Sequence, residues 1–236
     1  MGRRHLFPVL LVLAILIPIQ AAFGGPICTS GTLAGYEALG AGGCSIGAVT
    51  VASFGAVSGS AGATAIDPTV VAITPGGGTT NPELTFSVDL TATTPSLLEA
   101  IFTYAISGPA FTMDTITLSN SSETADGAVT DIQNYCIGGH FGPDGVTGCT
   151  GAVSGALLAL DGIQNTDQTT ILGVTQLSIT DDFTLDGGTA GSATGGIFAD
   201  QFTSTSTTTV TPEPGGFLLT ASGLALAAIR KFRSTH

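Results

Sequence analysis

Apolar and polar side chains alternate along the segment ELTFSVDLTA, residues 83–92. Leu84, Phe86 and Val88 share one face of an extended chain, because successive side chains of a strand point to opposite sides. Similar runs, rich in β-branched and aromatic residues and bounded by Gly, Pro, Asn and Asp, occupy residues 47–54, 69–74, 100–107, 111–119, 127–136, 169–180 and 195–203. Eight such runs predict an all-β fold, an antiparallel β-sandwich for which a jelly roll is one possible topology.

Two local predictions complete this pattern. Gly108-Pro109 predicts a turn between the runs at 100–107 and 111–119. The segment PSLLEA, residues 95–100, predicts a single helical turn. The folded body is expected to cover residues 25–202.

Positive charge is absent from the whole middle of the chain. Residues 25–211 contain no Lys or Arg, whereas sixteen of the 17 acidic residues lie there, all except Glu213. A body of formal charge −16 has nothing to neutralise phosphate, so nucleic-acid binding is excluded. With no Lys available, exposed strand edges must be protected by Asp, Gly and Pro.

The amino-terminal end has the layout of a secretory signal. Arg3 and Arg4 precede an apolar run at residues 6–19, and Ala22 and Gly24 occupy the small-residue positions of a cleavage site before Gly25. An uncleaved membrane helix is the alternative, although the run is shorter than the roughly 20 residues that span a bilayer. Residues 1–24 are therefore predicted to be a signal peptide, and the protein is predicted to be exported.

The carboxyl-terminal end has three consecutive parts. A Thr- and Ser-rich tract at 203–211 predicts an extended linker. Pro212-Glu213-Pro214 follows, then an uncharged segment at 217–229, and then a basic end at 230–233. The uncharged segment would measure roughly 20 Å as a helix, a marginal membrane helix whose basic end stays in the cytoplasm. A buried core helix is the alternative, but it leaves the basic end unexplained.

This tail, residues 212–236, resembles the PEP-CTERM sorting signal. The residues that carry the resemblance are Pro212, Glu213, Pro214, Arg230, Lys231 and Arg233. The resemblance implies recognition by an exosortase in a polysaccharide-producing Gram-negative bacterium. It also implies a transient inner-membrane anchor, followed by transfer to the cell surface or extracellular matrix. Whether the tail is then cleaved or kept as an anchor is left open by the sequence.

The body shows a second resemblance. The segments LGAGGCSIGAVTVASF, YCIGG and DFTLDGGTAGSA are similar to a recurrent, functionally uncharacterised body of PEP-CTERM proteins. This resemblance implies an all-β exported domain and supplies no catalytic residues.

Four cysteines lie in two pairs that are close in sequence. Three connectivities are possible. The pairing of Cys28 with Cys44 and of Cys136 with Cys149 is favoured because each closes a loop of roughly 15 residues, worth about 3 kcal/mol in the chain-entropy model. Export to an oxidising compartment favours disulfides. The alternative is a metal site formed by Cys136, His140 and Cys149.

Carboxylates are the only plentiful groups for acid–base chemistry. They gather at Asp161 and Asp167 and at Asp181, Asp182 and Asp186. Two carboxylates about 5 to 9.5 Å apart would suit a glycoside hydrolase, but Asp next to Gly is more typical of turns. The same five residues are candidates for binding calcium, because converging carboxylates have no Lys or Arg to pair with. His140, the only histidine of the body, is expected in a surface loop.

These observations predict a non-enzymatic protein of the cell surface or extracellular matrix, without a catalytic residue or an obligatory cofactor. Extracellular polysaccharide is a candidate partner. A carbohydrate-binding module on the same sandwich is the alternative, although the chain has no Trp to stack on a sugar ring. A secreted glycoside hydrolase is the third hypothesis.

Overall fold

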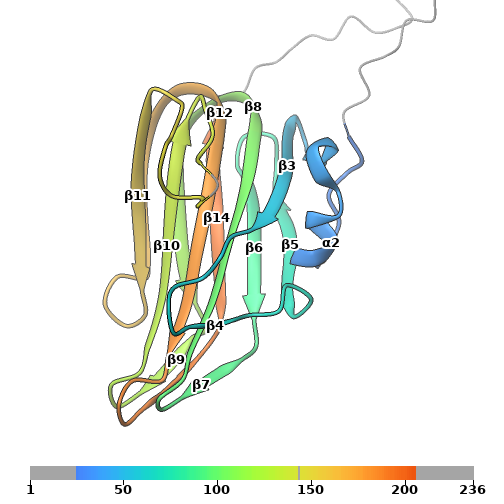
Figure 1. The fold of residues 1–236 in the computed structure, drawn as a ribbon. Helices are drawn as coiled ribbons and strands as arrows, with labels where there is room; N and C mark the ends of the chain where they lie inside the picture. Colours follow the sequence, from blue (N-terminus) through green and yellow to red (C-terminus); the bar gives the residue numbers. More distant parts are fainter. Residues whose placement is uncertain (1–24, 143, 206–236) are drawn as a thin grey trace, which may run out of the picture. The chain divides into compact units, whose positions relative to one another are not determined.

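The computed structural model of the chain describes residues 25–142 and 144–205 (Figure 1). The predicted signal peptide, the sorting tail with its membrane helix, and residues 206–211 of the linker lie outside the described residues. In the part that is described, no helix is long and apolar enough to cross a membrane.

The described residues form a mostly antiparallel β fold, consistent with the predicted all-β sandwich. The strands are β1 (Gly31–Thr32), β2 (Cys44–Ile46), β3 (Val49–Ala56), β4 (Thr64–Ala65), β5 (Val71–Gly77), β6 (Pro82–Val88), β7 (Thr91–Thr93), β8 (Leu97–Ser119), β9 (Ser122–Thr124), β10 (Ala128–Ile137), β11 (Val153–Leu160), β12 (Thr166–Asp186), β13 (Ser192–Thr194) and β14 (Ile197–Ser204). One short helix, α2 (Leu33–Glu37), and a 3₁₀ turn, η2 (Gly40–Gly42), precede β2.

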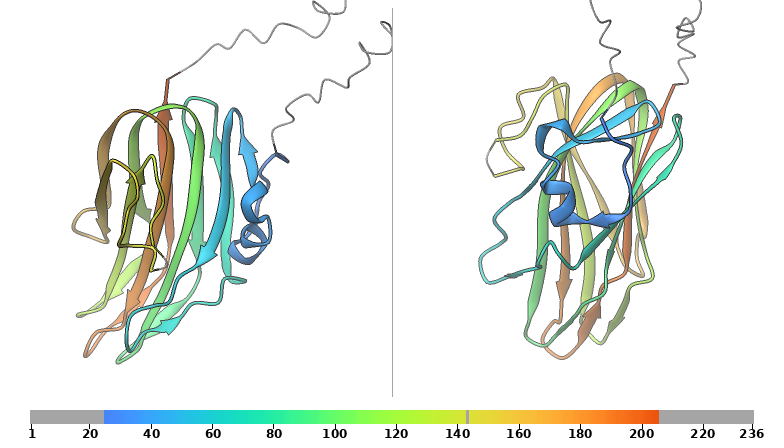
Figure 2. Two further views of the ribbon diagram at one scale, coloured as in Figure 1. Left: turned by 45° about the horizontal axis from the view of Figure 1, so that its top comes forward. Right: turned by 90° about the vertical axis from the view of Figure 1, so that its right-hand side faces the viewer.

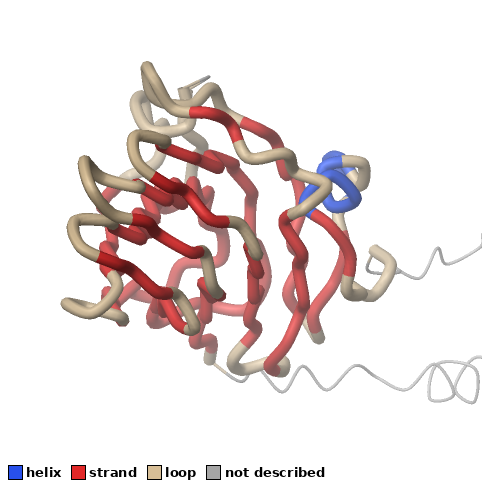
Figure 3. The backbone as a smooth tube through the Cα atoms, turned by 90° about the horizontal axis from the view of Figure 1, so that it is seen from below, coloured by secondary structure: helices blue, strands red, loops and turns tan. Residues whose placement is uncertain are grey.

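Two long strands connect the two layers of the sandwich. The first half of β8 pairs with β3 and with the second half of β12, which in turn pairs with β10, and β10 pairs with β11. The second half of β8 pairs with the first half of β12 and with β14, which continues to β6 and β5. Seen from below, the strands curve around a common interior (Figure 3).

Two local predictions were wrong at β8. Gly108-Pro109 is not a turn between two strands, because β8 runs without a break over 23 residues. The ladder between β8 and β12 shifts register on either side of Val174. Gly108 and Pro109 lie in the second of these irregular stretches, opposite the segment between Val174 and Gln176. Such irregularities bend a strand pair without ending it. The segment at 95–100 is not a helical turn either, because β8 begins at Leu97.

Aromatic rings fill the space between the layers. Phe198 of β14 stacks on Phe86 of β6 at a centroid distance of 4.7 Å and on Phe183 of β12 at 4.8 Å. Phe102 of β8 lies 4.9 Å from Phe86. All four side chains are 0% exposed. The core therefore forms where the apolar faces of strands from both layers meet, as the period-two pattern predicts.

The amino-terminal segment packs against β3. The Thr32 hydroxyl accepts a hydrogen bond from the Gly35 N–H and caps α2. Tyr36 of α2 meets Phe54 of β3 edge to face at 5.2 Å. The predicted disulfide between Cys28 and Cys44 is confirmed and ties the start of the body to β2. Figure 2 shows α2 outside the strands.

Carboxylates protect exposed backbone, as the lack of Lys predicts. Asp167 accepts a hydrogen bond from the backbone N–H of Leu158 at 3.0 Å, on the edge strand β11. At the far end of the molecule, Asp126 accepts hydrogen bonds from Thr189 and Ala190 beside the small sheet of β7, β13 and β9. The side-chain hydrogen bond from Thr189 and the two backbone N–H groups lower the pKa of Asp126 to about 2.

Candidate functional site

A loop, of which residues 138–142 and 144–152 are described, lies across the outer face of the layer formed by β8 and β12. The disulfide between Cys136 and Cys149 is present as predicted and closes the loop, with 5.6 Å between the two Cα atoms. The Thr180 hydroxyl of β12 donates a hydrogen bond to the Gly145 carbonyl oxygen. Gly145 has a φ of +70°, which favours glycine, and a Cβ atom at this position would lie only 2.9 Å from Val57 and 3.1 Å from Thr103. The loop is thus fixed to the sheet at both its base and its tip.

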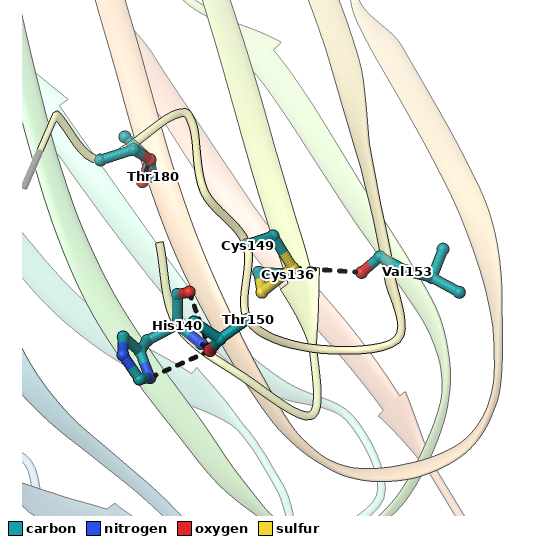
Figure 4. Close-up of a disulfide and its surroundings, with 7 residues drawn as sticks. Cys136, His140, Cys149, Thr150, Val153 and Thr180 are labelled. Carbon is teal, nitrogen blue, oxygen red and sulfur yellow. Dashed lines mark hydrogen bonds between the residues drawn. A yellow bond between two sulfur atoms is a disulfide. The ribbon is translucent and has the colours of Figure 1, made fainter. Parts of the chain in front are cut away.

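His140 lies exposed near the base of this loop (Figure 4). Its Nδ1 atom is 3.3 Å from the Thr150 hydroxyl, and its backbone N–H donates to the same hydroxyl at 3.1 Å. The sulfur of Cys149 lies 3.7 Å from the Val153 carbonyl oxygen, a packing contact because an oxidised sulfur has no hydrogen to donate. The alternative metal site of Cys136, His140 and Cys149 is excluded, since both sulfurs are bonded to each other.

A groove of about 300 Å³ runs between the loop and the sheet. It is lined by neutral residues: Ser53, Thr103, Tyr104, Ala105, Gly139, His140, Phe141, Gly142, Gln176 and Ser178. On the sheet side the groove is lined by residues with hydroxyl and amide groups, and the loop supplies an aromatic ring and an imidazole. The lining contains no carboxylate, so the groove suits an uncharged polar ligand rather than a cation.

The five predicted calcium candidates are dispersed by the fold. Asp161 is half-buried in the turn after β11, and Asp167 protects the edge of β11. Asp186 is exposed and accepts a hydrogen bond from the Gly188 N–H. Asp181 points into the core, whereas its neighbour Asp182 points to the opposite side of β12. Within residues 25–142 and 144–205, no group of three acidic, His or Cys side chains is arranged to hold a metal ion.

The location of Asp181 also bears on the hydrolase hypothesis. Its side chain is 0% exposed. A catalytic carboxyl must contact its substrate, and a polysaccharide cannot reach the interior of the sandwich. Asp181 and Asp182 therefore do not form a catalytic pair on one surface.

The sandwich interior contains an unexpected group of polar side chains. We call it the interior acid cluster and define it as Asp114, Asp131, Gln133, Asp181 and Asp200, all of which are 0% exposed. Asp114 of β8 and Asp200 of β14 belong to one layer, and the other three, from β10 and β12, belong to the facing layer. Gln133 and Asp181 are direct cross-strand neighbours.

Few hydrogen bonds stabilise this cluster. The Tyr104 hydroxyl donates to Oδ2 of Asp200 at 2.6 Å. With the carboxyls counted as ionised, both oxygens of Asp114, Asp131 and Asp181 lack a partner, as do both amide atoms of Gln133. Buried polar groups in folded proteins are nearly always paired. The protonation state of the cluster is therefore the main chemical question that it raises.

Burial raises the pKa of all four carboxyl groups in the cluster. It raises the pKa of Asp114, of Asp131 and of Asp181 well above the ordinary value, and the negative charge of Asp200 raises each of them further. Burial also raises the pKa of Asp200, but only to about 6, because the Tyr104 hydroxyl donates to its carboxylate and the nearby side chains of Asp181 and Gln133 also favour the charged form. Asp200 is therefore the first of the four to ionise.

Sequence reasoning missed this cluster, although a signal was present. Asp200 lies between Phe198 and Phe202, in phase with the buried face of its strand. Asp131 is likewise in phase with Val129, and Asp181 with Ile179 and Phe183. Attention to the parity of each Asp within its strand would have separated these buried acids from the turn acids.

Comparisons with known proteins reveal distant similarities only. No family model and no curated protein matches the chain. A solved carbohydrate-binding module in complex with β-1,4-galactotriose is 11% identical, with 64% of this chain and 81% of that chain covered and a TM-score of 0.23. The enzymatically active domain of bacteriophage CBA120 tailspike protein 4 is 14% identical, with 66% of this chain and 19% of that chain covered and a TM-score of 0.26. Such low scores do not establish a shared function.

Proposed function

We propose that this chain is a non-enzymatic protein of the cell surface or extracellular matrix, exported and then sorted through its PEP-CTERM-like tail by an exosortase. The observation that carries the proposal is the pair of disulfides, which engage all four cysteines of the body. Disulfides of this kind form and persist outside the cytoplasm, so they indicate an extracellular or periplasmic protein.

The charge pattern supports the same route. The exported body carries no Lys or Arg, whereas both ends of the chain are basic. Basic residues next to apolar segments remain on the cytoplasmic side of a membrane, and a cation-free body between them is free to cross. The last described strand, β14, includes the first two residues of the predicted linker and ends at Ser204, so the rest of that Thr- and Ser-rich tract would separate the body from the membrane.

Replacement of Pro212, Glu213 and Pro214 by alanine tests the sorting step in the native host. The wild-type chain should be recovered from the surface or medium, and most of the variant should stay in the inner-membrane fraction. A matched control replaces Thr207, Thr208 and Thr209 in the linker by alanine and should distribute like the wild type. Identical distributions of the tail variant and the wild type, by immunoblotting of the fractions, would contradict sorting through this tail.

The groove favours a second function on the same body, the binding of neutral glycans. Its outer-sheet residues Gln176 and Ser178 and the nearby Thr103 offer both donors and acceptors, which is what sugar hydroxyls require. Its volume of about 300 Å³ is at the lower end for ligand sites and suits one or two sugar rings. Extracellular polysaccharide would then be the ligand that retains the protein in the matrix.

A glycan microarray probed with the full chain tests this second function. Replacement of Gln176 and Ser178 by alanine should weaken binding to any retained glycan by at least about fivefold, because each lost hydrogen bond to an uncharged ligand costs about 0.5–1.5 kcal/mol. Thr166→Ala, exposed on the same strand but outside the groove, should bind like the wild type. The absence of any retained glycan, or equal binding by the double variant, would exclude the groove as a glycan site.

A further inference from the structure

The described groups that face the interior acid cluster are acids, neutral polar groups and apolar side chains, with no cation among them. Asp114 and Tyr104 face it from β8, Asp200 from β14, Asp131 and Gln133 from β10, and Asp181 from β12. The nearest other charges that act on it are also acidic, since Asp182 raises the pKa of Asp131 and is itself influenced by Glu99. The aromatic core residues Phe102 and Phe183 are cross-strand neighbours of Asp181 and Asp131.

Within the described residues, no Lys or Arg side chain is available to compensate these charges. Residues 25–211 contain no Lys or Arg, and His140 is exposed in the loop on the outer side of the sheet. An uncompensated carboxylate in an apolar interior costs several kcal/mol, so such a group usually binds a proton instead. Four ionised carboxylates would also repel one another across the interior.

Protonation gives the cluster the donors that it lacks. A protonated Asp181 donates to Asp200, which also receives the hydrogen bond from Tyr104. The unpartnered amide of Gln133, fully buried beside Asp181, supplies a further donor and acceptor. Protons therefore convert a group of orphaned acceptors into a partly paired network.

We propose that the interior acid cluster is a proton-binding element, in which Asp114, Asp131 and Asp181 stay protonated in the folded protein, so that the exported body is most stable in acid and loosens as its surroundings become alkaline. The proposal is independent of the exosortase route and of the glycan groove. The cluster makes the stability of the fold depend on the external pH.

The direction in which folding stability depends on pH follows from the pKa shifts of the four Asp residues. In the unfolded chain each Asp has its ordinary pKa of 3.8, whereas in the folded chain the pKa is raised. Between the two values the folded state binds more protons, so unfolding releases protons and a rising pH favours the unfolded state. The stabilisation is complete below pH 3.8 and is lost as the pH rises. For Asp200 the loss ends at about pH 6, and for the other three it extends further.

Thermal unfolding of the full chain between pH 4 and pH 9, in the presence of EDTA, tests the proposal. The folding equilibrium constant of the wild type should fall by about tenfold per pH unit for each carboxyl that remains protonated. Asp114→Asn and Asp131→Asn, which replace the acid by a neutral side chain of the same shape, should each make the decline shallower. At pH 8 each variant should therefore be more stable than the wild type.

A surface variant separates this effect from general charge repulsion. An acidic protein loses some stability at high pH simply because its charges repel one another. Asp89→Asn removes the same unit of charge from an exposed position and should leave the slope close to that of the wild type. Equal slopes for Asp89→Asn and the two cluster variants, or a wild type that is at least as stable at pH 8 as at pH 4, would overturn the proposal.

Infrared spectroscopy provides a second readout that does not depend on unfolding. The folded wild type at pH 7 should show the carbonyl band of protonated carboxylic acid, and the band should weaken in Asp131→Asn. Absence of this band at pH 7 would overturn the proposal. So would a rise in the melting temperature at pH 8 when excess calcium replaces EDTA, if the rise is lost in both cluster variants, because the cluster would then hold a cation.

Discussion

Replacement of Phe198 by alanine should lower the free energy of unfolding by about 3–5 kcal/mol, the usual cost of truncating a fully buried Phe. Phe198 stacks on Phe86 from its own layer and on Phe183 from the facing layer, so the substitution opens a cavity between the two sheets. Strand β14 is paired with β6 on one side and with β8 on the other. This pairing limits how far the backbone around Phe198 can move to fill the cavity. Urea denaturation of the full chain at pH 5 measures the loss.

Leu172→Ala provides the control for this experiment. Leu172 is 87% exposed where β12 bends, so its truncation should change the free energy of unfolding by less than about 0.5 kcal/mol. A loss below 1 kcal/mol for Phe198→Ala, or equal losses for the two variants, would contradict the aromatic packing between the layers.

Removal of both disulfides should have a still larger effect. Each links cysteines only 16 or 13 residues apart and contributes about 3 kcal/mol in the chain-entropy model. The two bonds lie in separate parts of the fold, one beside β2 and the other at the end of β10, so their contributions should add to about 6 kcal/mol. Because domains are typically stable by only 5–15 kcal/mol, replacement of all four cysteines by serine should leave the body marginal or unfolded.

The two double variants should differ in their local effects. Loss of Cys136–Cys149 should free the 138–152 loop and expose its amides to hydrogen exchange, whereas loss of Cys28–Cys44 should act on the segment before β2. Addition of a reductant to the wild type should reproduce the instability of the four-serine variant and should not affect that variant further. Equal urea midpoints for the wild type with and without reductant would show that the disulfides do not stabilise the body.

The strands were predictable because their pattern is local. Leu84, Phe86 and Val88 alternate with polar residues, and runs rich in β-branched and aromatic residues indicated strands in the regions of β10, β12 and β14. The continuity of β8 was not predictable, because it depends on a partner. Gly108-Pro109 has the composition of a turn, but β12 bends opposite it and continues the pairing on both sides.

The sites were harder to predict from the sequence than the strands. The disulfide pairing followed from short spacing, but the groove is formed by the 138–152 loop together with residues 103–105 and 176–178, which only the folded sheet brings together. The interior acid cluster was not predicted, because Asp114, Asp131 and Asp200 are single acids within separate predicted strands and only acids close together in sequence were considered. Asp131 and Asp200 point to the same side of their strands as their buried neighbours, although acidic side chains usually lie on the surface. Such exceptions are typical of functional or strained sites.

The mass and thiol content of the mature chain, purified from its native host, test the export account most directly. The account predicts a polypeptide that begins at Gly25, that weighs four hydrogens less than its reduced form, and that does not react with an alkylating reagent until it is reduced. A chain of full length, found in the cytosol with four reactive thiols, would contradict it.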